Sequence, residues 1–410
     1  MRTNAGLIEQ LYREQSRQVL ATLIGILGDF SLAEDAMQEA FAAAVHQWPM
    51  DGTPDNPTAW LIRAGQRRGI DQIRRKQTAR QYAHLLEPLD DAVADIDEQF
   101  IEDNQLRLLF TCCHPALSQG ARVALTLREM CGLTTEQVAR GLLQKPATLA
   151  QRIVRAKNKI RSAAIPYEVP EARELPKRLP GVLQVIYLVF NEGYSRSDGE
   201  TVVDIGLSAE AVRLAREVAR LLPDGEVFAL LALMLLHDSR RHAREDGLGQ
   251  LVTLEEQDRS RWDQERIREG LLWLEQALAR TPVGPYTLQA SIAAVHAQAR
   301  RAEDTDWHRI VRLYEALYRQ QPSPVIALNH AVAVAMRDTP AAGLHLLAEL
   351  DSHKEILNYH LFHAVRADLQ RRAGNRDAAR AAYRRALELA AQGPEQRFLE
   401  RRLHELDASG

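Results

Sequence analysis

The chain has 410 residues, a formal net charge of −3 and 46% hydrophobic residues. This length predicts two or three domains, and the chain has no apolar run of about 18 residues that would span a membrane. Two of the three cysteines are neighbours, which does not suit a disulfide framework, and the N-terminal sequence lacks the apolar core of a secretory signal. We therefore expect a protein of the reducing cytoplasm with no membrane partner.

Alanine, leucine, arginine and glutamate are abundant and runs of β-branched residues are few, so the composition predicts an all-α protein. Prolines at 166, 170, 176 and 180 interrupt the helical pattern and mark a boundary. The expected segments are a helical block at 1–82, an acidic linker at 83–103, a second helical block at 104–165, a linker at 166–180 and a helical extension at 181–410.

The first block ends in the basic stretch Trp60–Arg80, "WLIRAGQRRGIDQIRRKQTAR", where seven basic residues accompany one acid. Ile62, Gly65, Gly69 and Ile73 have helical spacing and form an apolar stripe, so the arginines lie largely outside it. A solvated helix face normally mixes charges of both signs, whereas this one is uniformly positive and indicates an anionic partner. The preceding residues 49–59 predict a loop, which Trp48 and Trp60 bracket and which is suited to hold an unstacked base.

The second block ends in another basic helix. Six positive residues and no acid lie between positions 145 and 161, whereas residues 87–103 carry eight acids and no base. Thr134 or Thr135 caps a short helix, residues 144–146 make a turn, and residues 147–162 form a second helix. This pattern predicts a helix-turn-helix whose second helix lies in the DNA major groove, with a generic antiparallel helix pair as the alternative.

The helical extension ends in three similar units that start at Tyr286, Val325 and Tyr359. Each unit reads as a helix, a short polar turn and a second helix, which resembles tetratricopeptide repeats with a period of about 34 residues. An irregular helical bundle is the alternative. The polar stretch "FNEGYSRSDGE" at 190–200 is suited to bind a small ligand, or is a structured loop at a domain junction.

These motifs together resemble a known family. The stretch Leu32–Trp48, "LAEDAMQEAFAAAVHQW", followed by the first basic helix resembles region 2 of bacterial sigma-70-type factors, and the helix-turn-helix resembles region 4. Regions 1.1 and 3 have no recognisable counterpart, which is the layout of the extracytoplasmic-function (ECF) class. The long helical extension is similar to that of the ECF subgroup with a C-terminal tetratricopeptide-like domain.

The resemblance implies an RNA polymerase sigma factor that recruits core polymerase to promoter DNA and has no enzymatic activity of its own. The partners it implies are promoter DNA, the clamp helices of the polymerase β′ subunit and the β subunit. The helix after Trp60 matches the segment beside the −10 element, with DNA contacts expected from Trp60, Arg63, Arg67, Arg68, Arg74, Arg75 and Lys76. The second helix of the helix-turn-helix matches the −35 reader, with contacts expected from Lys145, Thr148, Gln151, Arg152, Arg155 and Lys159. The "AEDAMQEAF" pattern matches the surface that docks on the clamp helices, through Asp35, Gln38 and Glu39.

Two clusters resemble metal sites. Cys112, Cys113 and His114, with Cys131 nearby, offer zinc ligands, but adjacent cysteines are a poor tetrahedral pair and no C-x-x-C is present. Asp238 and His242 have i, i+4 spacing and lack an evident third ligand. We therefore expect no metal and no cofactor.

Two other classes of protein fit parts of the sequence. An ordinary DNA-binding regulator would use the helix-turn-helix without polymerase, and it would leave the "AEDAMQEAF" pattern and the first basic helix unexplained. A scaffold would use mainly the C-terminal repeats. No phosphate-binding loop, nucleophile elbow or pair of catalytic carboxylates supports an enzyme. For the helical extension we expect a regulatory role or the binding of a protein partner or ligand.

Overall fold

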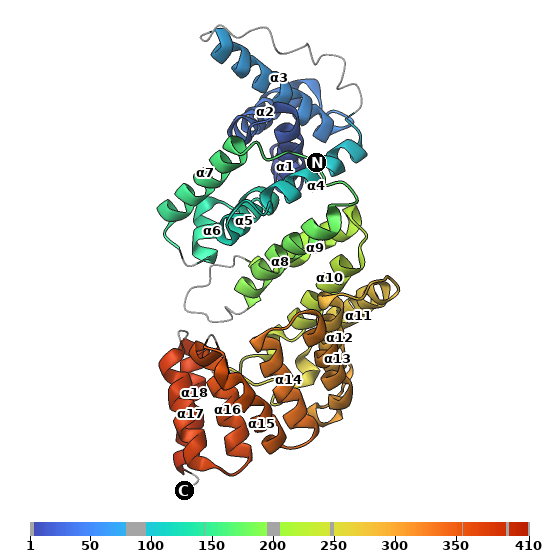
Figure 1. Cartoon of the computed structure of the whole chain (residues 1–410). Helices are drawn as coiled ribbons and strands as arrows, with labels where there is room; N and C mark the ends of the chain where they lie inside the picture. The colour runs from blue at the N-terminus through green and yellow to red at the C-terminus, as the bar shows by residue number, and fades with distance from the viewer. Residues whose placement is uncertain are drawn as a thin grey trace. The chain divides into compact units, whose positions relative to one another are not determined.

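The computed structural model describes residues 4–78, 96–142, 144–194, 206–246, 250–354, 356–390 and 393–408, without the side chains of residues 4, 5, 76–78, 140, 141 and 408. The described residues form helices joined by short loops, with one isolated β-bridge between Glu245 and Leu251 (Figure 1). The predicted all-α class is confirmed. Contacts divide the chain into two compact units, Met1–Glu192 with Ile205–Leu214, and Gly193–Asp204 with Ala215–Gly410.

The first unit begins with three packed helices, α1 (Asn4–Leu27), α2 (Phe30–Asp51) and α3 (Pro57–Thr78). The Asp29 side chain caps α2 by accepting a hydrogen bond from the Leu32 amide at 3.0 Å. Ile62, Gly65 and Gly69 of α3 are buried, as the apolar stripe predicted. A Cβ on Gly65 would lie 2.7 Å from Leu23 of α1, so the glycine permits the close approach of the two helices.

The helix-turn-helix follows in the same unit, after α4 (Glu98–Cys112), α5 (Gln119–Leu125) and the π-helical turn η1 (Thr126–Met130). Its helices are α6 (Thr135–Gly141) and α7 (Pro146–Ser162). Thr134 caps α6 through a reciprocal pair, since its hydroxyl accepts from the Gln137 amide while the Gln137 side chain accepts from the Thr134 amide. Proline at the first position of α7 needs no hydrogen-bonded amide there, so it starts the helix cleanly.

The two helical blocks pack on each other through α1 and α4. The hydroxyl of Tyr167, which lies beyond α7, is 2.6 Å from the Ala21 carbonyl oxygen and 3.1 Å from that of Asn104. Helices α8 (Leu175–Tyr194) and α9 (Leu207–Leu221) come next. Arg178 of α8 donates to the Phe110 carbonyl at 3.0 Å, so the first unit continues past residue 180, where the sequence suggested a boundary. Pro176 lies in the first turn of α8, where an amide has no partner in any case.

The second unit contains α10 (Gly225–Asp238), α11 (Gln264–Leu278), α12 (Pro285–Gln298) and α13 (Trp307–Gln320), with the 3₁₀ turns η2 (Arg241–Ala243), η3 (Arg259–Arg261) and η4 (Ala302–Asp304). Almost every side chain of α10 is buried, because α11 and α12 cover it. Asp238, at the end of α10, is paired with Arg241 and Arg266. Asp238 is therefore a buried carboxylate that two arginines neutralise.

Consecutive antiparallel pairs then stack in order (Figure 1). The elements are α14 (Pro324–Arg337), α15 (Pro340–Glu349), η5 (Leu350–Ser352), η6 (Ile356–Asn358), α16 (His360–Arg372), α17 (Arg376–Leu389) and α18 (Gly393–Ala408). Helices α12, α14 and α16 begin within one residue of the three repeat starts read from the sequence. Ser323 and Thr339 cap α14 and α15 ahead of a proline at the first helical position.

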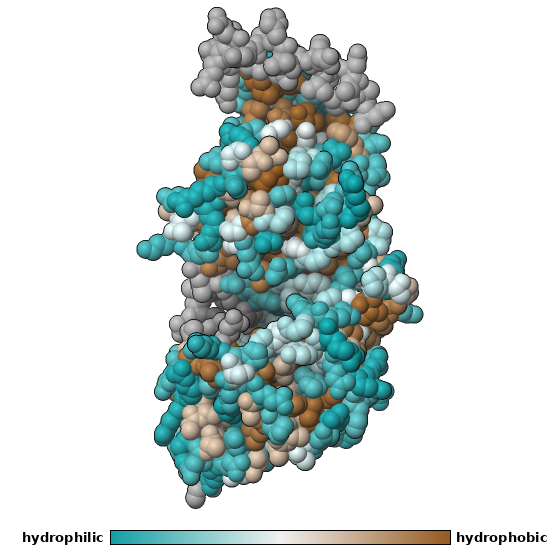
Figure 2. All heavy atoms as spheres, viewed as in Figure 1, coloured by the Kyte–Doolittle hydropathy of each residue, from teal (hydrophilic) through white to brown (hydrophobic). Residues whose placement is uncertain are grey.

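Across the described residues, no helix has the length and apolar character needed to cross a membrane. On the face drawn in Figure 2, hydrophilic residues predominate and hydrophobic residues gather in small patches.

Gly343 tests how closely α14 and α15 pack. A Cβ at this position would lie 2.5 Å from the Ala335 Cβ and 2.9 Å from the Ala331 carbonyl oxygen, neither of which can turn aside. Overpacking costs about 1–3 kcal/mol, while alanine improves helix propensity by about 1 kcal/mol. We expect Gly343→Ala to lower the free energy of unfolding by on the order of 1 kcal/mol in urea titrations of the full chain. Gly181→Ala in α8 is the matched control. A Cβ at position 181 would lie 3.5 Å from an Arg122 nitrogen, an ordinary contact, so this substitution should leave stability unchanged or raise it.

Candidate nucleic-acid and protein interfaces

The first candidate surface is the exposed side of α3. Arg63, Arg67, Arg68, Arg74 and Arg75 are all exposed there, opposite the buried stripe, and Trp60 is half-buried at the start of the helix. The side chain of Lys76 lies outside the described part. Five guanidinium groups on one face of one helix form a positive surface of the kind that binds a phosphate backbone.

The two tryptophans expected to bracket a base have different environments. Trp48 is 2% exposed, and its ring contacts that of Trp60 edge to face, with 5.3 Å between centroids. Trp48 is therefore a core residue, and only Trp60 keeps exposed surface for stacking. The loop is also shorter than residues 49–59, because α2 continues through Pro49 to Asp51 and α3 begins at Pro57.

The second candidate surface is the acidic side of α2. Asp35, Gln38 and Glu39 are exposed, while the alternating Ala36, Met37 and Ala40 are buried. Glu39 accepts a hydrogen bond from Gln72 at 3.0 Å and lies 3.8 Å from the Arg68 guanidinium. The candidate polymerase surface on α2 thus adjoins the candidate DNA surface on α3.

The third candidate surface is the outward side of α7. Leu149, Ile153, Ala156 and Ile160 are buried as predicted. The candidate −35 contacts Lys145, Thr148, Gln151, Arg155 and Lys159 are exposed, and Arg152 is half-buried. Among them lies Val154, which is 57% exposed and which sequence reasoning passed over. An exposed β-branched side chain on such a helix suits contact with a thymine methyl group.

Lys157 of α7 also belongs to the basic run, yet it has a different role. Its side chain is 11% exposed, and its Nζ lies 2.8 Å from Glu34 Oε2 of α2 and 3.0 Å from Glu129 Oε1 of η1. Arg128 joins Glu34 at 3.4 Å, and Lys157 Nζ also lies 5.6 Å from the centroid of the Phe30 ring. This cluster, Glu34, Arg128, Glu129 and Lys157, ties the acidic helix of the first block to the second helix of the helix-turn-helix.

Burial and charge oppose each other in this cluster. Burial raises the pKa of Glu129 above its ordinary value, because the Lys157 charge compensates only part of the desolvation. Burial lowers the pKa of Lys157, but Glu129 and Glu34 outweigh it and hold that pKa above its ordinary value. The lysine therefore stays charged, and it is the principal compensation for a carboxylate that is 1% exposed.

The cysteines do not form a metal site. Cys112, Cys113 and Cys131 are buried and form no disulfide, and the Cys113 Sγ lies 3.6 Å from the Thr126 hydroxyl. Burial raises the pKa of Cys113 to about 11 and also raises that of Cys112, so both thiols are protonated at neutral pH. Among the described side chains, no three His, Cys, Asp or Glu residues gather closely enough to hold a metal ion.

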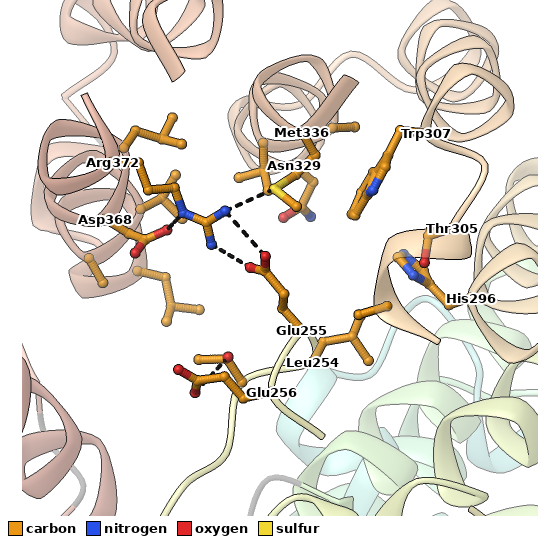
Figure 3. A pocket seen from close by; sticks show the side chains of 18 of the residues that line it. Leu254, Glu255, Glu256, His296, Thr305, Trp307, Asn329, Met336, Asp368 and Arg372 are labelled. Carbon is orange, nitrogen blue, oxygen red and sulfur yellow. Dashed lines mark hydrogen bonds and ion pairs between the residues drawn. The ribbon is translucent and has the colours of Figure 1, made fainter. Parts of the chain in front are cut away.

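A cavity of about 720 Å³ lies within the second unit, between α13, α14, α16 and α18 and the loop around Glu255 (Figure 3). Apolar side chains make most of its wall. Arg372 and Arg402 lie beside Glu255 and Glu256, and Arg259 lies beside Thr305. Nothing in the sequence pointed to it, because its lining residues are spread from Thr253 to Arg402. The candidate ligand stretch at 190–200 extends into residues outside the described part, so it is not assigned.

Three segments of the chain match known families. Residues 11–80 match sigma-70 region 2, residues 107–160 match sigma-70 region 4, and residues 178–278 match a family of unknown function, DUF6596. The chain is 41% identical to an uncharacterised protein, R00370, of Rhizobium meliloti (strain 1021) over 99% of its length and 97% of that protein.

Two relatives carry functional names. The probable ECF RNA polymerase sigma factor SigI of Mycobacterium tuberculosis (strain ATCC 25618 / H37Rv) is 27% identical over 44% of this chain and 60% of SigI. The ECF RNA polymerase sigma factor SigK of Mycobacterium bovis (strain BCG / Pasteur 1173P2) is 26% identical over 37% of this chain and 83% of SigK. The chain therefore contains region 2 and region 4 of the sigma-70 family, followed by a DUF6596 segment. Proteins of this family are not enzymes.

Lys157→Met tests the buried cluster. The substitution leaves Glu129 buried without its main counter-charge, which costs about 3–5 kcal/mol of unfolding free energy at neutral pH. A buried carboxyl with a raised pKa destabilises the fold only above the pKa that it has in the unfolded chain. The loss should therefore shrink as the pH falls from the raised pKa of Glu129 toward the ordinary value of glutamate, because the buried carboxyl takes up a proton over this interval. Urea titrations at neutral and mildly acidic pH measure both values.

Arg155→Met, on the exposed side of the same helix, is the matched control and should change stability by less than about 0.5 kcal/mol. A loss for Lys157→Met that is independent of pH, or no larger than that of the control, would contradict the role given to the cluster.

Proposed function

We propose that this ECF sigma factor reads two promoter elements with the exposed faces of α3 and α7 while α2 holds core RNA polymerase. One observation carries the proposal most strongly. In a chain with a net charge of −3, α3 exposes five arginines against the single acid Asp71, and α7 has no acidic residue. These two helices lie in the segments that match region 2 and region 4.

The α3 surface is proposed to bind the −10 element. Arg63, Arg67, Arg68, Arg74 and Arg75, together with Lys76, suit contacts to phosphates, which position a protein on DNA without reading sequence. The half-buried Trp60 supplies an aromatic face next to the loop at 52–56, where an unpaired base would stack. Support comes from the exposure of this arginine set on one side of α3.

The α7 surface is proposed to read the −35 element in the major groove. A recognition helix places residues near its N-terminus on base edges, and Thr148 and Gln151 are exposed there. Arg155 follows one turn later, and Lys145 and Lys159 flank the set, as phosphate contacts require. Arg152, half-buried, borders this surface from the side of α5.

Core polymerase is the implied partner of both sigma regions, and α2 is proposed as the site that docks on the β′ clamp helices. Asp35, Gln38 and Glu39 place an acidic surface beside the positive one, which suits a basic groove on a protein. The acidic linker at 83–103 is proposed to follow the nucleic-acid path through polymerase, on the grounds of its charge and position. For the last helix pairs we propose a tetratricopeptide-like stack that regulates activity or binds a partner, supported by repeat starts that coincide with α12, α14 and α16.

Run-off transcription with core polymerase on a promoter library tests the proposal. We expect discrete transcripts that share −10 and −35 sequences. Arg75→Ala and Arg155→Ala should each lower the yield by on the order of fivefold, since each removes a phosphate contact. Arg173→Ala, an exposed arginine beyond the helix-turn-helix, is the matched control and should leave the yield unchanged.

The salt dependence of the yield provides a second readout, because each lost phosphate contact reduces the slope of log affinity against log salt by about one. DNA binding without transcripts at any salt concentration would favour an ordinary regulator. Transcripts that are equally sensitive to Arg173→Ala would contradict the assignment of α3 and α7.

A further inference from the structure

We propose that the cavity in the second unit, together with the arginines at its rim, is a docking site for a segment of a partner protein in which a leucine precedes two acidic residues. The proposal deepens the proposed partner-binding role of the C-terminal helices. It rests on how the chain itself occupies this site, and it does not depend on promoter recognition.

The chain covers the site with its own residues Gln250–Gln257, "QLVTLEEQ", here called the strap. In the first half of the strap, Leu251 forms an antiparallel bridge with Glu245, and the Val252 amide donates to the Arg244 carbonyl at 2.8 Å. Its second half is a turn, in which the Glu256 amide donates to the Thr253 carbonyl. The strap thus presents Leu254, Glu255 and Glu256 in succession to the helices around it.

Two ion pairs hold the acids of the strap. Glu255 lies 2.5 Å from an Arg372 nitrogen of α16, and Glu256 lies 2.5 Å from an Arg402 nitrogen of α18. Burial raises the pKa of Glu256, but hydrogen bonds from Arg402 and Thr253 outweigh burial and hold that pKa below its ordinary value. Arg401 adds hydrogen bonds to the Gln250 side chain and the Leu251 carbonyl. Figure 3 shows Arg372 between Asp368 on its own helix and Glu255 of the strap.

Next to the acids, Leu254 lines the cavity. Figure 3 shows it on the same loop as Glu255, on the side of the cavity where Trp307, His296 and Thr305 also lie. A space of about 720 Å³ is far more than one leucine fills, and it lies in the range of sites that take a drug-sized molecule or several side chains. The apolar wall is formed in part by Ile310, Val332, Met336, Leu361 and Val365. A partner segment with large apolar residues around its leucine would bury more surface here than the strap does.

Charge selects an acidic occupant. The helices α16 and α18 contribute Arg371, Arg372 and Arg402 to the lining. Asp368 pairs with the first two and Glu405 with the third, so three arginines face two acids until the strap adds two glutamates. The two ion pairs of the strap are open to competition, because the side chains of Glu255 and Glu256 are 46% and 44% exposed and water screens them. A partner that offers two acids and a larger apolar side chain would therefore displace it.

Fluorescence anisotropy with the full chain tests the site, with a labelled synthetic peptide of residues 250–257 as the probe. In the latch variant Glu255→Gln/Glu256→Gln, Arg372 and Arg402 lose the carboxylates of the strap and keep only Asp368 and Glu405 on their own helices. We therefore expect the peptide to bind at least tenfold more tightly than to the wild type. Adding Arg372→Gln and Arg402→Gln to the latch variant should abolish that gain. Glu171→Gln/Glu174→Gln, a pair of acids with exposed ion pairs in the first unit, is the matched control for net charge.

Two further peptides define what the site reads. A copy of the probe with glutamine at both acidic positions should lose the affinity. The chain repeats the order of two leucines and two acids at Leu86, Leu89, Asp90 and Asp91, so a peptide of residues 84–93 should bind the latch variant as well. Equal affinity of the probe for the wild type and the latch variant would overturn the proposal, as would binding of the glutamine copy or failure of the second peptide. Because the readout is peptide affinity, a failure here is distinct from a failure of promoter-directed transcription.

Discussion

The distribution of positive charge is the constraint on which this structure depends. The chain as a whole is slightly acidic, yet five arginines are exposed together on α3. The second helix of the helix-turn-helix, α7, has no acidic residue. Such faces repel themselves and lower stability unless the opposite side of each helix is well packed. Here the buried side of α3 includes Leu61, Ile62 and Gly65, and the buried side of α7 includes Leu149, Ile153 and Ile160. Packing on one side thus permits a charged surface on the other, and an anionic partner relieves the repulsion.

Lys157 shows how the same basic run also serves the fold. It lies on the flank of α7, where Glu34 of α2 and the buried Glu129 surround it. Burying these charges costs more in desolvation than an exposed pair would, so the contact contributes more to specificity of packing than to net stability. In consequence Lys157 connects the acidic helix that is proposed to bind polymerase to the helix that is proposed to read DNA.

Much of the fold could be predicted because it rests on local patterns. Helical periodicity, the Thr134 cap and the proline at the start of α7 are all local, and the repeat starts coincide with α12, α14 and α16. The buried Trp48, the pairing of Asp238 with Arg266 and the continuation of the first unit into α8 depend on contacts between distant residues, which no single-sequence pattern contains. The strap and its cavity belong to the same group, because Glu255 and Arg372 are 117 residues apart. The spacing of the arginines predicted which of them are exposed. That Lys157 is buried and Val154 is exposed depends on how the helices pack, which the spacing does not contain.

Site-specific crosslinking in a complex with core polymerase and promoter DNA tests the central claim most directly. A photoreactive residue at position 63 of α3 and another at position 151 of α7 would each be mapped on the same promoter fragment. The account predicts two separate sites, with position 63 at the −10 element and position 151 at the −35 element. Crosslinks from both positions at one site, or from position 151 alone, would contradict it.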